Sequence, residues 1–121
     1  MEKIFIIEDD KTMQLLLKTL LEMEGFLVNI PDDFSEKSLL LNIQSYHPDF
    51  ILMDVNLRHL SGLDLLKKIR SKKKYDNIKI IMSSGMSKES ECLQSGADIF
   101  IQKPYAPSTL LEWLKSNGQG E

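Results

Sequence analysis

The 121-residue chain has little cysteine, no long apolar run and no excess of basic residues. Its single cysteine, Cys92, excludes a disulfide within the chain and suits a reducing compartment. No apolar run approaches the roughly 18 residues that span a membrane, so we expect no membrane contact. Residues 1–10 lack the apolar segment of a signal peptide, which predicts a cytoplasmic protein. A net charge of −3 argues against direct nucleic acid binding, which needs a basic surface.

What is present is an alternation of short apolar runs with helical patterns from one end to the other. The apolar runs are residues 3–7, 27–30, 50–53, 78–82 and 98–101. Nearly continuous apolar strands are typical of a parallel sheet that helices cover on both faces. We therefore predict one α/β domain over residues 1–121, with a tail at 117–121. Its doubly wound sheet is expected to hold five parallel strands in the flavodoxin-like order 2-1-3-4-5, together with five helices.

The expected helices have recognisable ends. An apolar stripe predicts the first helix, which Gly25 ends. Asp33 and Glu36 have the spacing of a capping box, so we expect the second helix to begin beside them. Asp10 or Thr12 is expected to cap the first helix. The remaining helices are predicted to begin at about residues 61, 87 and 107, the last of them with Pro107 in its first turn.

Charged and hydroxyl residues follow four of the five apolar runs. They are Glu8 and Asp9 after the first run, Asp54 after the third, Ser83 and Ser84 after the fourth, and Lys103 after the fifth. The carboxyl ends of parallel strands share one edge of the sheet, where such folds bind ligands. Several carboxylates meeting there need a cation, and oxygen ligands with water suit Mg²⁺. The hydroxyl and the lysine on the other side suit a phosphoryl group.

The same residues give the chain a family resemblance over essentially its whole length. It resembles the receiver domain of bacterial two-component response regulators. The matching stretches are IFIIEDDKTM, PDFILMDVNLRHLSG, IKIIMSSG, SGADIFIQKPY and the last helix. The joint pattern is specific, although no single stretch is. Within the family, DDKTM and MDVNL are most similar to the chemotaxis regulators.

The resemblance implies a role for the residues at the edge of the sheet. Asp54 would be the phosphoacceptor, and Lys103 would pair with a phosphoryl oxygen. Mg²⁺ would bind Asp9 and Asp54 directly, Glu8 directly or through water, and the backbone carbonyl of Asn56. The Lys103–Pro104 peptide bond is cis in the family, which the sequence allows.

The resemblance also implies a switch and its partners. Ser84 would close onto the phosphoryl group, and Phe100 would turn inward, although a plain core role for Phe100 stays open. A histidine kinase or phosphotransfer protein would be the phosphodonor, and a downstream protein target would read the face of helix four, strand five and helix five. A phosphorylation-dependent dimer is compatible with this reading. The domain would catalyse only its own phosphorylation and dephosphorylation.

Several positions depart from the usual pattern of the family. Glu8 replaces the commoner aspartate, Arg58 stands where proline is usual, and Gly85 stands where alanine is common. Ser83 is adjacent to Ser84 and competes with it for the switch role. The segment from Ser84 to Lys103 is about three residues shorter than in the chemotaxis regulators, so we expect a reduced or shifted fourth helix.

Three other functions compete with this reading. A phosphatase of the haloacid dehalogenase type needs a second aspartate two residues after the nucleophile, where Asn56 cannot protonate a leaving group. A flavodoxin-like FMN binder needs a hydroxyl- and glycine-rich loop after the first strand, where three acids would repel phosphate. A degenerate receiver that serves only as an interaction module stays open, because of Arg58 and the short fourth helix.

Overall fold

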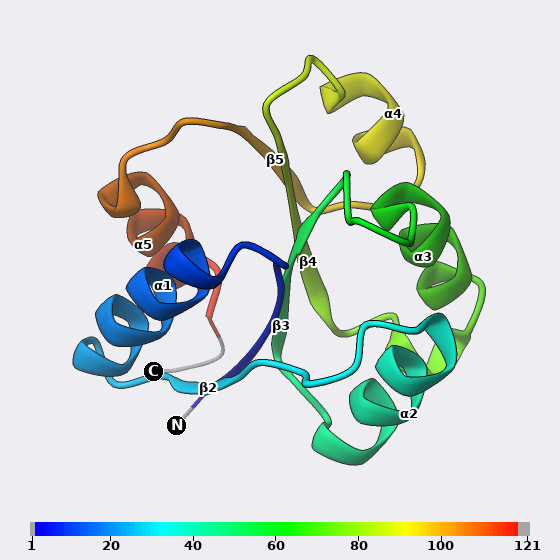
Figure 1. Ribbon diagram of the computed structural model, residues 1–121, viewed down its shortest axis with the longest axis horizontal. Coiled ribbons are helices and arrows are strands. Elements are labelled where there is room, and N and C mark those ends of the chain that lie inside the picture. Colours follow the sequence, from blue (N-terminus) through cyan, green and yellow to red (C-terminus); the bar gives the residue numbers. More distant parts are fainter. Residues whose placement is uncertain (1, 119–121) are drawn as a thin grey trace.

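The computed structural model describes residues 2–118, so residues 119–121 of the expected tail lie outside the described residues. A five-stranded parallel sheet in the order β2-β1-β3-β4-β5 lies between two layers of helices (Figure 1). The strands are β1 (Lys3–Ile7), β2 (Leu27–Asn29), β3 (Phe50–Asp54), β4 (Lys79–Ser84) and β5 (Ile99–Gln102). The helices are α1 (Lys11–Met23), α2 (Glu36–Tyr46), α3 (Gly62–Arg70), the 3-10 helix η1 (Lys73–Tyr75), α4 (Glu89–Gln94) and α5 (Pro107–Ser116). The predicted fold class and strand order are confirmed.

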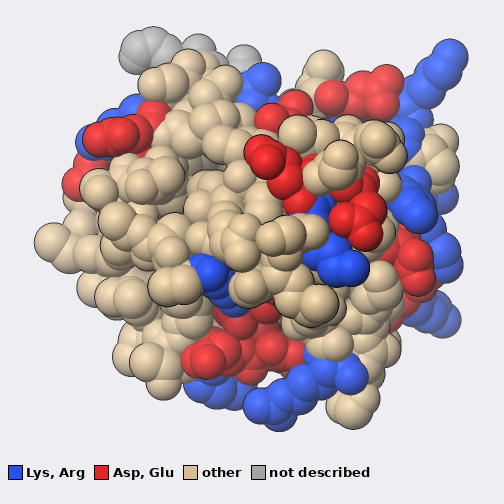
Figure 2. Space-filling view, turned by 90° about the horizontal axis from the view of Figure 1, so that it is seen from above, with Lys and Arg blue, Asp and Glu red and all other residues tan. Residues whose placement is uncertain are grey.

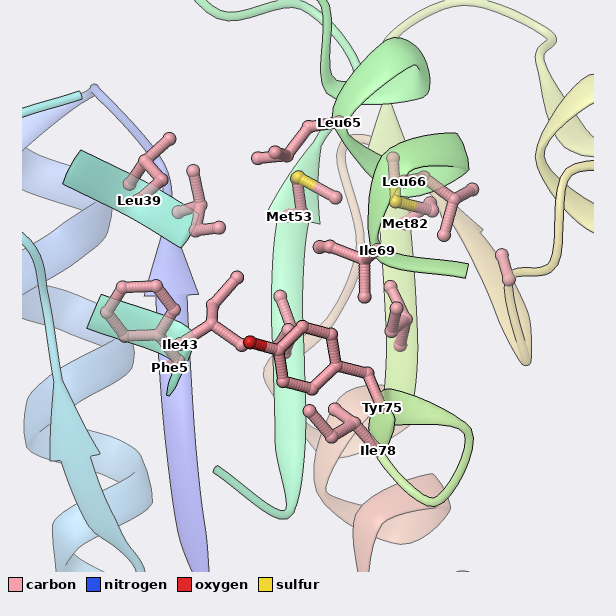
Figure 3. Packing of buried hydrophobic residues seen from close by; sticks show 14 of the residues in the cluster. Phe5, Leu39, Ile43, Met53, Leu65, Leu66, Ile69, Tyr75, Ile78 and Met82 are labelled. Atoms are coloured by element: carbon pink, nitrogen blue, oxygen red, sulfur yellow. The ribbon is translucent and has the colours of Figure 1, made fainter. Parts of the chain in front are cut away.

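The continuous apolar runs arise because both faces of the sheet are buried. In β1, Phe5 and Ile7 point into the core under α2 and α3, whereas Ile4 and Ile6 point into the core under α1 and α5. Figure 1 shows these two helix layers on opposite sides of the sheet, and Figure 3 shows the first core from close by. In the second core, Phe50 of β3 packs edge-on against aromatic rings of α5 and of the segment before β2. Alternate residues of each central strand therefore stabilise different helix layers.

Polar side chains cap the N-termini of three helices, α1, α2 and α3. The side chain of Asp10 accepts a hydrogen bond from Met13 N at 3.0 Å and caps α1, as predicted. Ser61 caps α3 in the same way, and Pro107 lies in the first turn of α5. The capping box expected at Asp33 is wrong, because Ser35 is the N-cap of α2.

The reason for the shifted cap is a local turn. Asp33 Oδ1 accepts a hydrogen bond from the backbone N of Ser35 at 2.9 Å, two residues along the chain. Aspartate side chains commonly close such turns. Because Asp33 closes this turn, the helix begins two residues later, with Ser35 as its N-cap. Ser35 Oγ then accepts the hydrogen bond from Ser38 N that a cap must accept.

Three strands, β3, β4 and β5, extend beyond the carboxyl ends of the predicted apolar runs, β5 only by Gln102. Asp54 is the last residue of β3, and Ser83 and Ser84 end β4. Their backbones stay in the sheet because Asp54 pairs with Ser83 and Ser84 pairs with Gln102. The backbone of these three residues is therefore held by hydrogen bonds of the sheet, and their side chains project from strands rather than from loops. The short fourth helix is confirmed, since α4 has six residues. Within residues 2–118, no helix combines the length and apolar character needed to cross a membrane.

Candidate functional site at the carboxyl edge of the sheet

A pocket of about 560 Å³ lies at the carboxyl edge of the sheet, the edge that faces the viewer in Figure 2. Its lining comes from the turn after β1, the first turn of α1, the end of β3 and the loops after β4 and β5. The lining residues are Glu8, Asp9, Asp10, Met13, Asp54, Gly85, Lys103 and Pro104. The structure thus brings together the three acids and the lysine that the sequence places at strand ends.

Asp54 is held in place by backbone contacts on two sides. On one side, Asp54 pairs with Ser83 of β4 in the sheet, and Val55 N donates a 2.8 Å hydrogen bond to Ser83 O. On the other side α3 begins so close that a Cβ atom on Gly62 would lie 2.1 Å from the Asp54 carbonyl oxygen. Only glycine permits that approach without a shift of the backbone. The Asp54 carboxylate therefore projects from a rigid support.

Lys103 lies between two carboxylates from different strands. Its Nζ is 2.8 Å from Glu8 Oε1 and 3.1 Å from Asp54 Oδ2. The side chains of Glu8, Asp54 and Lys103 are only 5%, 12% and 22% exposed. Burial alone lowers the pKa of Lys103, but the hydrogen bonds and charges of Glu8 and Asp54 outweigh it and raise that pKa. The ammonium group therefore stays charged at neutral pH, beside Asp54.

The turn after β1 is tied to the loop after β3. Asp9 Oδ2 accepts a hydrogen bond from the backbone N of Arg58 at 2.7 Å, and Glu8 Oε2 accepts one from Asp10 N at 3.0 Å. The first contact was not foreseen, because the Arg58 backbone gives no signal in the sequence. The one signal in the sequence is that Arg58 stands where proline is usual in the family. A proline at this position would have no N–H group to donate. Arg58 therefore permits a contact that the commoner residue would prevent.

The oxygen donors at this edge match the chemistry of Mg²⁺. Among residues 2–118, no group of three or more His, Cys, Asp and Glu side chains lies close enough to hold a metal ion. Mg²⁺ does not require such a group, because it commonly takes one or two carboxylates and keeps several waters. Asp9 and Asp54 line the pocket and, with the backbone carbonyl of Asn56 that the resemblance implies, would provide a set of that size. Imidazole and thiol groups are missing from the pocket lining, which disfavours Zn²⁺.

Ser84 is next to the pocket and bonds to the loops around it. It is fully buried, and its Oγ accepts hydrogen bonds from Met86 N at 3.0 Å and from Asn56 Nδ2 at 3.5 Å. The Asn56 amide also contacts Met86 Sδ at 3.9 Å. Sequence reasoning assigned only the carbonyl of Asn56 and missed its side chain, which connects the loop after β3 with the loop after β4.

The predicted switch residue Phe100 does not line this pocket. It is half-buried on β5, where it pairs with Met82 and packs against the core under α2 and α3. A ring that is partly exposed has room to become more buried, but this conformation is also that of an ordinary core residue. The Lys103–Pro104 peptide bond is cis, as the resemblance implied.

Sequence comparisons identify relatives along nearly the whole chain. The family model of the response regulator receiver domain matches residues 4–115. The phosphate regulon transcriptional regulatory protein PhoB of Rhizobium meliloti is 31% identical over 119 residues, covering 94% of this chain and 51% of the relative. The chemotaxis protein CheY homolog of Campylobacter jejuni is 28% identical, covering 98% of this chain and 96% of the relative. The chain thus spans about half of one relative and nearly all of the other.

Solved structures show the same fold. The chemotaxis response regulator CheY4 of Vibrio cholerae superimposes with a TM-score of 0.85 at 26% identity, covering 96% of this chain and 98% of that chain. The receiver domain of Francisella response regulator 1452 also gives a TM-score of 0.85 at 26% identity, with 96% and 95% coverage. The arrangement of strands and helices around the pocket is therefore one that these regulators share.

Proposed function

The chain belongs to the response regulator receiver domain family, and we propose that it accepts a phosphoryl group on Asp54 from a histidine kinase or phosphotransfer protein. The observation that carries this proposal is the position of Lys103 Nζ, 3.1 Å from Asp54 Oδ2 and 2.8 Å from Glu8 Oε1. A partly buried cation beside a rigidly held carboxylate suits a site that must gain further negative charge.

In the proposed reaction an oxygen of Asp54 attacks the phosphorus atom of a phosphohistidine donor. The P–N bond breaks, its electron pair stays on the imidazole nitrogen, and an acyl phosphate forms on Asp54. Lys103 pairs with a phosphoryl oxygen in place of Asp54 Oδ2, while Glu8 keeps its contact with the ammonium group. These contacts supply most of the catalysis that the protein must provide, because phosphoryl transfer depends mainly on positioning and neutralisation of charge.

Mg²⁺ belongs to this proposal, in which Asp9, Asp54 and the backbone carbonyl of Asn56 would bind the ion and Glu8 would contribute directly or through water. When bound, the ion supplies positive charge for the phosphoryl oxygens. The chain itself positions these donors, since Asp54 ends a central strand and Asp9 is anchored to the loop after β3.

The signalling step in this proposal uses Ser84 and Phe100. Ser84 gives up its hydrogen bond from Met86 N and bonds to the phosphoryl group, and Phe100 turns further into the core. The face of α4, β5 and α5 then changes and is read by a downstream protein or by a second phosphorylated copy. The chain would turn over no substrate besides its own acyl phosphate.

Intact mass spectrometry after incubation with acetyl phosphate and Mg²⁺ tests the proposal. The wild type should gain one phosphoryl group, Asp54→Asn should gain none, and the exposed-acid control Asp76→Asn should behave as wild type. Chelation of Mg²⁺ should suppress the adduct. An adduct retained by Asp54→Asn would refute the assignment. Failure of the wild type to react with any phosphodonor would favour a degenerate receiver.

A further inference from the structure

The basic residues of the chain are concentrated in one short segment. Residues 67–79, here called the basic segment, contain seven of the 15 Lys and Arg residues and one of the 18 Asp and Glu residues. The segment therefore has a formal charge of +6, while the rest of the chain has −9. Figure 2 shows basic side chains, with acidic ones between them, along the side of the molecule where α2 and α3 lie. Such a local excess is a long-range attractant for an acidic partner.

Much of this charge is unpaired. Lys68 pairs with Glu36 and Arg70 with Asp98, but Lys72, Lys73 and Lys74 form no ion pair with any described residue. All three lysines are exposed. Three adjacent ammonium groups repel one another, and the site around Asp54 does not use them. Lys74 Nζ lies over the Tyr75 ring, 5.1 Å from its centroid.

A separate pocket lies beside these lysines, between the end of α2 and η1. Its volume is about 260 Å³, and its apolar lining includes Ile43, Tyr75 and Ile78. These three residues are at most 8% exposed. Figure 3 shows the Tyr75 ring extending from η1 toward Ile43, with Ile78 next to it. His47 and Lys74 also line the pocket and carry polar groups at its edge.

The Tyr75 side chain has an unused hydrogen-bonding group. Its hydroxyl makes no hydrogen bond with any described residue, although Tyr75 is only 7% exposed. No fully buried side-chain oxygen or nitrogen in residues 2–118 lacks a partner, so this hydroxyl must reach an open space. Tyr75 lines the pocket, so a ligand there would lie against its side chain. An unpaired hydroxyl over an apolar floor suits a ligand with both characters.

The wall of the pocket is held by hydrogen bonds. The Arg70 guanidinium donates to the carbonyl oxygens of Tyr75 at 3.0 Å and Ile78 at 2.8 Å. The same group donates to Gly96 O at 2.8 Å and Asp98 Oδ2 at 3.0 Å. The pocket is therefore largely preformed, and a ligand need not order it.

We propose that this pocket and the adjacent lysines bind an acidic segment of a partner protein. One large apolar or aromatic side chain would enter the pocket, and neighbouring carboxylates would pair with Lys72, Lys73 and Lys74. Pockets for drug-sized ligands usually have volumes of about 300–1,000 Å³. At about 260 Å³ this pocket is smaller, and it suits a single anchoring side chain better than a whole small molecule. The charge extends well beyond the pocket, which fits an extended segment.

The position of this surface separates it from the phosphoacceptor site. The pocket is built by the end of α2 and by η1, which precede β3 and β4. It therefore lies at the amino edge of the sheet, opposite the edge where Asp54 lies. The proposal goes beyond phosphoryl transfer, and binding here does not require Asp54 to be phosphorylated.

The first test uses a synthetic 12-residue peptide with one tryptophan flanked by glutamates, titrated into ¹⁵N-labelled protein. We expect saturable amide shifts confined to residues 43–48 and 72–79, weakening as salt rises. Peptides with tryptophan replaced by alanine, or with glutamates replaced by glutamine, should bind about tenfold more weakly, since anchors and charge pairs both contribute.

The second test changes the protein. Replacing Lys72, Lys73 and Lys74 by glutamine should weaken peptide binding about tenfold. The matched control replaces Lys11, Lys18 and Lys115 by glutamine and removes the same charge from α1 and α5. It should leave the affinity within about twofold. Tyr75→Phe deletes only the unpaired hydroxyl and should give an intermediate loss.

Several outcomes would overturn the proposal. They are no saturable shift at millimolar peptide, equal binding of the alanine peptide, equal binding of the glutamine peptide, and an equal loss in the two lysine variants. Tighter binding of a single-stranded oligonucleotide of the same charge would identify nucleic acid as the ligand and would also overturn it. None of these measurements involves Asp54, so their failure would leave the proposed phosphoacceptor role unaffected.

Discussion

Asp54 depends on a residue that carries no chemistry. Gly62 is the first residue of α3, and its lack of a side chain lets the helix begin against the Asp54 carbonyl. The contact constrains the path of the backbone where β3 ends at Asp54. The carboxylate is thus positioned by a backbone approach rather than by side-chain hydrogen bonds alone.

Gly62→Ala should therefore disturb both stability and phosphorylation. A Cβ atom 2.1 Å from the Asp54 oxygen must displace backbone on one side or the other. We expect the free energy of unfolding to fall by about 1–3 kcal/mol, and Asp54 to react more slowly with acetyl phosphate. Urea unfolding and intact mass measure the two effects.

Gly85→Ala is the matched control, because no atom lies within 4 Å of a Cβ placed at Gly85. Its free energy of unfolding should stay within about 0.5 kcal/mol of wild type. Equal stability of the two alanine variants would show that the close approach at Gly62 does not constrain the protein.

Ser84 offers a second test at the same scale. Ser84→Ala should still accept a phosphoryl group on Asp54, since the nucleophile and Lys103 are unchanged. We expect it to lose much of the response of residues 87–105 to beryllofluoride, a phosphoryl mimic, because the hydroxyl that would close onto the group is gone. Amide shifts with and without the mimic measure this response.

Ser83→Ala is the companion variant, because the two serines are adjacent at the end of β4. It should respond as wild type does. A normal response in Ser84→Ala together with a lost response in Ser83→Ala would assign the switch to Ser83 instead.

Among the α-helices, α4 is the shortest and has the fewest buried residues. It has six residues and no side-chain hydrogen bond at its N-cap, and Cys92 is its one buried residue. Helices of this length have little stability of their own, so α4 depends on packing against β5 and on Cys92. An element held so lightly can change position at small cost in free energy.

The thiol of Cys92 can report that movement. Burial, and to a smaller extent the charge of Glu91, raises the pKa of Cys92, so its reactive thiolate is scarcer than in the unfolded chain. Labelling of native protein should be on the order of a hundredfold slower than in urea, because it waits for local opening of α4.

The sign of the accompanying pH effect follows from the raised pKa. The stability that Cys92 contributes is present below its unfolded pKa of 9.0 and decreases as pH rises above that value. Thiol-labelling rates at several pH values test the argument, with no other cysteine to interfere. Equal rates in native and unfolded protein would show that α4 does not shield the thiol.

At the scale of the whole molecule, Arg70 joins parts of the chain that are distant in sequence. Its guanidinium donates hydrogen bonds to the end of η1, to the residue before β4 and to the turn before β5. Gly96, which has φ of +109°, leaves room for the Arg70 side chain, since a Cβ there would lie 2.5 Å from Arg70 Cγ. One side chain thereby connects α3 with η1, with the residue before β4 and with the turn after α4.

Arg70→Met keeps the apolar stem but removes every donor. It should lower the free energy of unfolding by about 2–3 kcal/mol, because several largely shielded acceptors lose a charged partner. Arg58→Met removes the chain's other arginine, which is exposed, and should change stability by about 0.5 kcal/mol or less. Chemical denaturation of both variants makes the comparison, and similar losses would contradict the role given to Arg70.

The sequence by itself determined the elements, their order and most of the site. Apolar periodicity reports burial along a strand or helix, so five runs were enough to predict the parallel sheet. Glu8, Asp9, Asp54 and Lys103 follow those runs directly, and the topology of a parallel sheet places all such residues at one edge. These inferences depend on neighbours in sequence or on general rules of topology.

Only the tertiary structure decided how distant residues meet. It revealed the approach of Gly62 to Asp54, the bond from Arg58 N to Asp9, and the pocket that Tyr75 lines beside the lysines. Each of these contacts depends on the course of a loop and on the packing of one element against another. Hydrophobic periodicity does not encode such distances, because many loop paths are compatible with the same buried face.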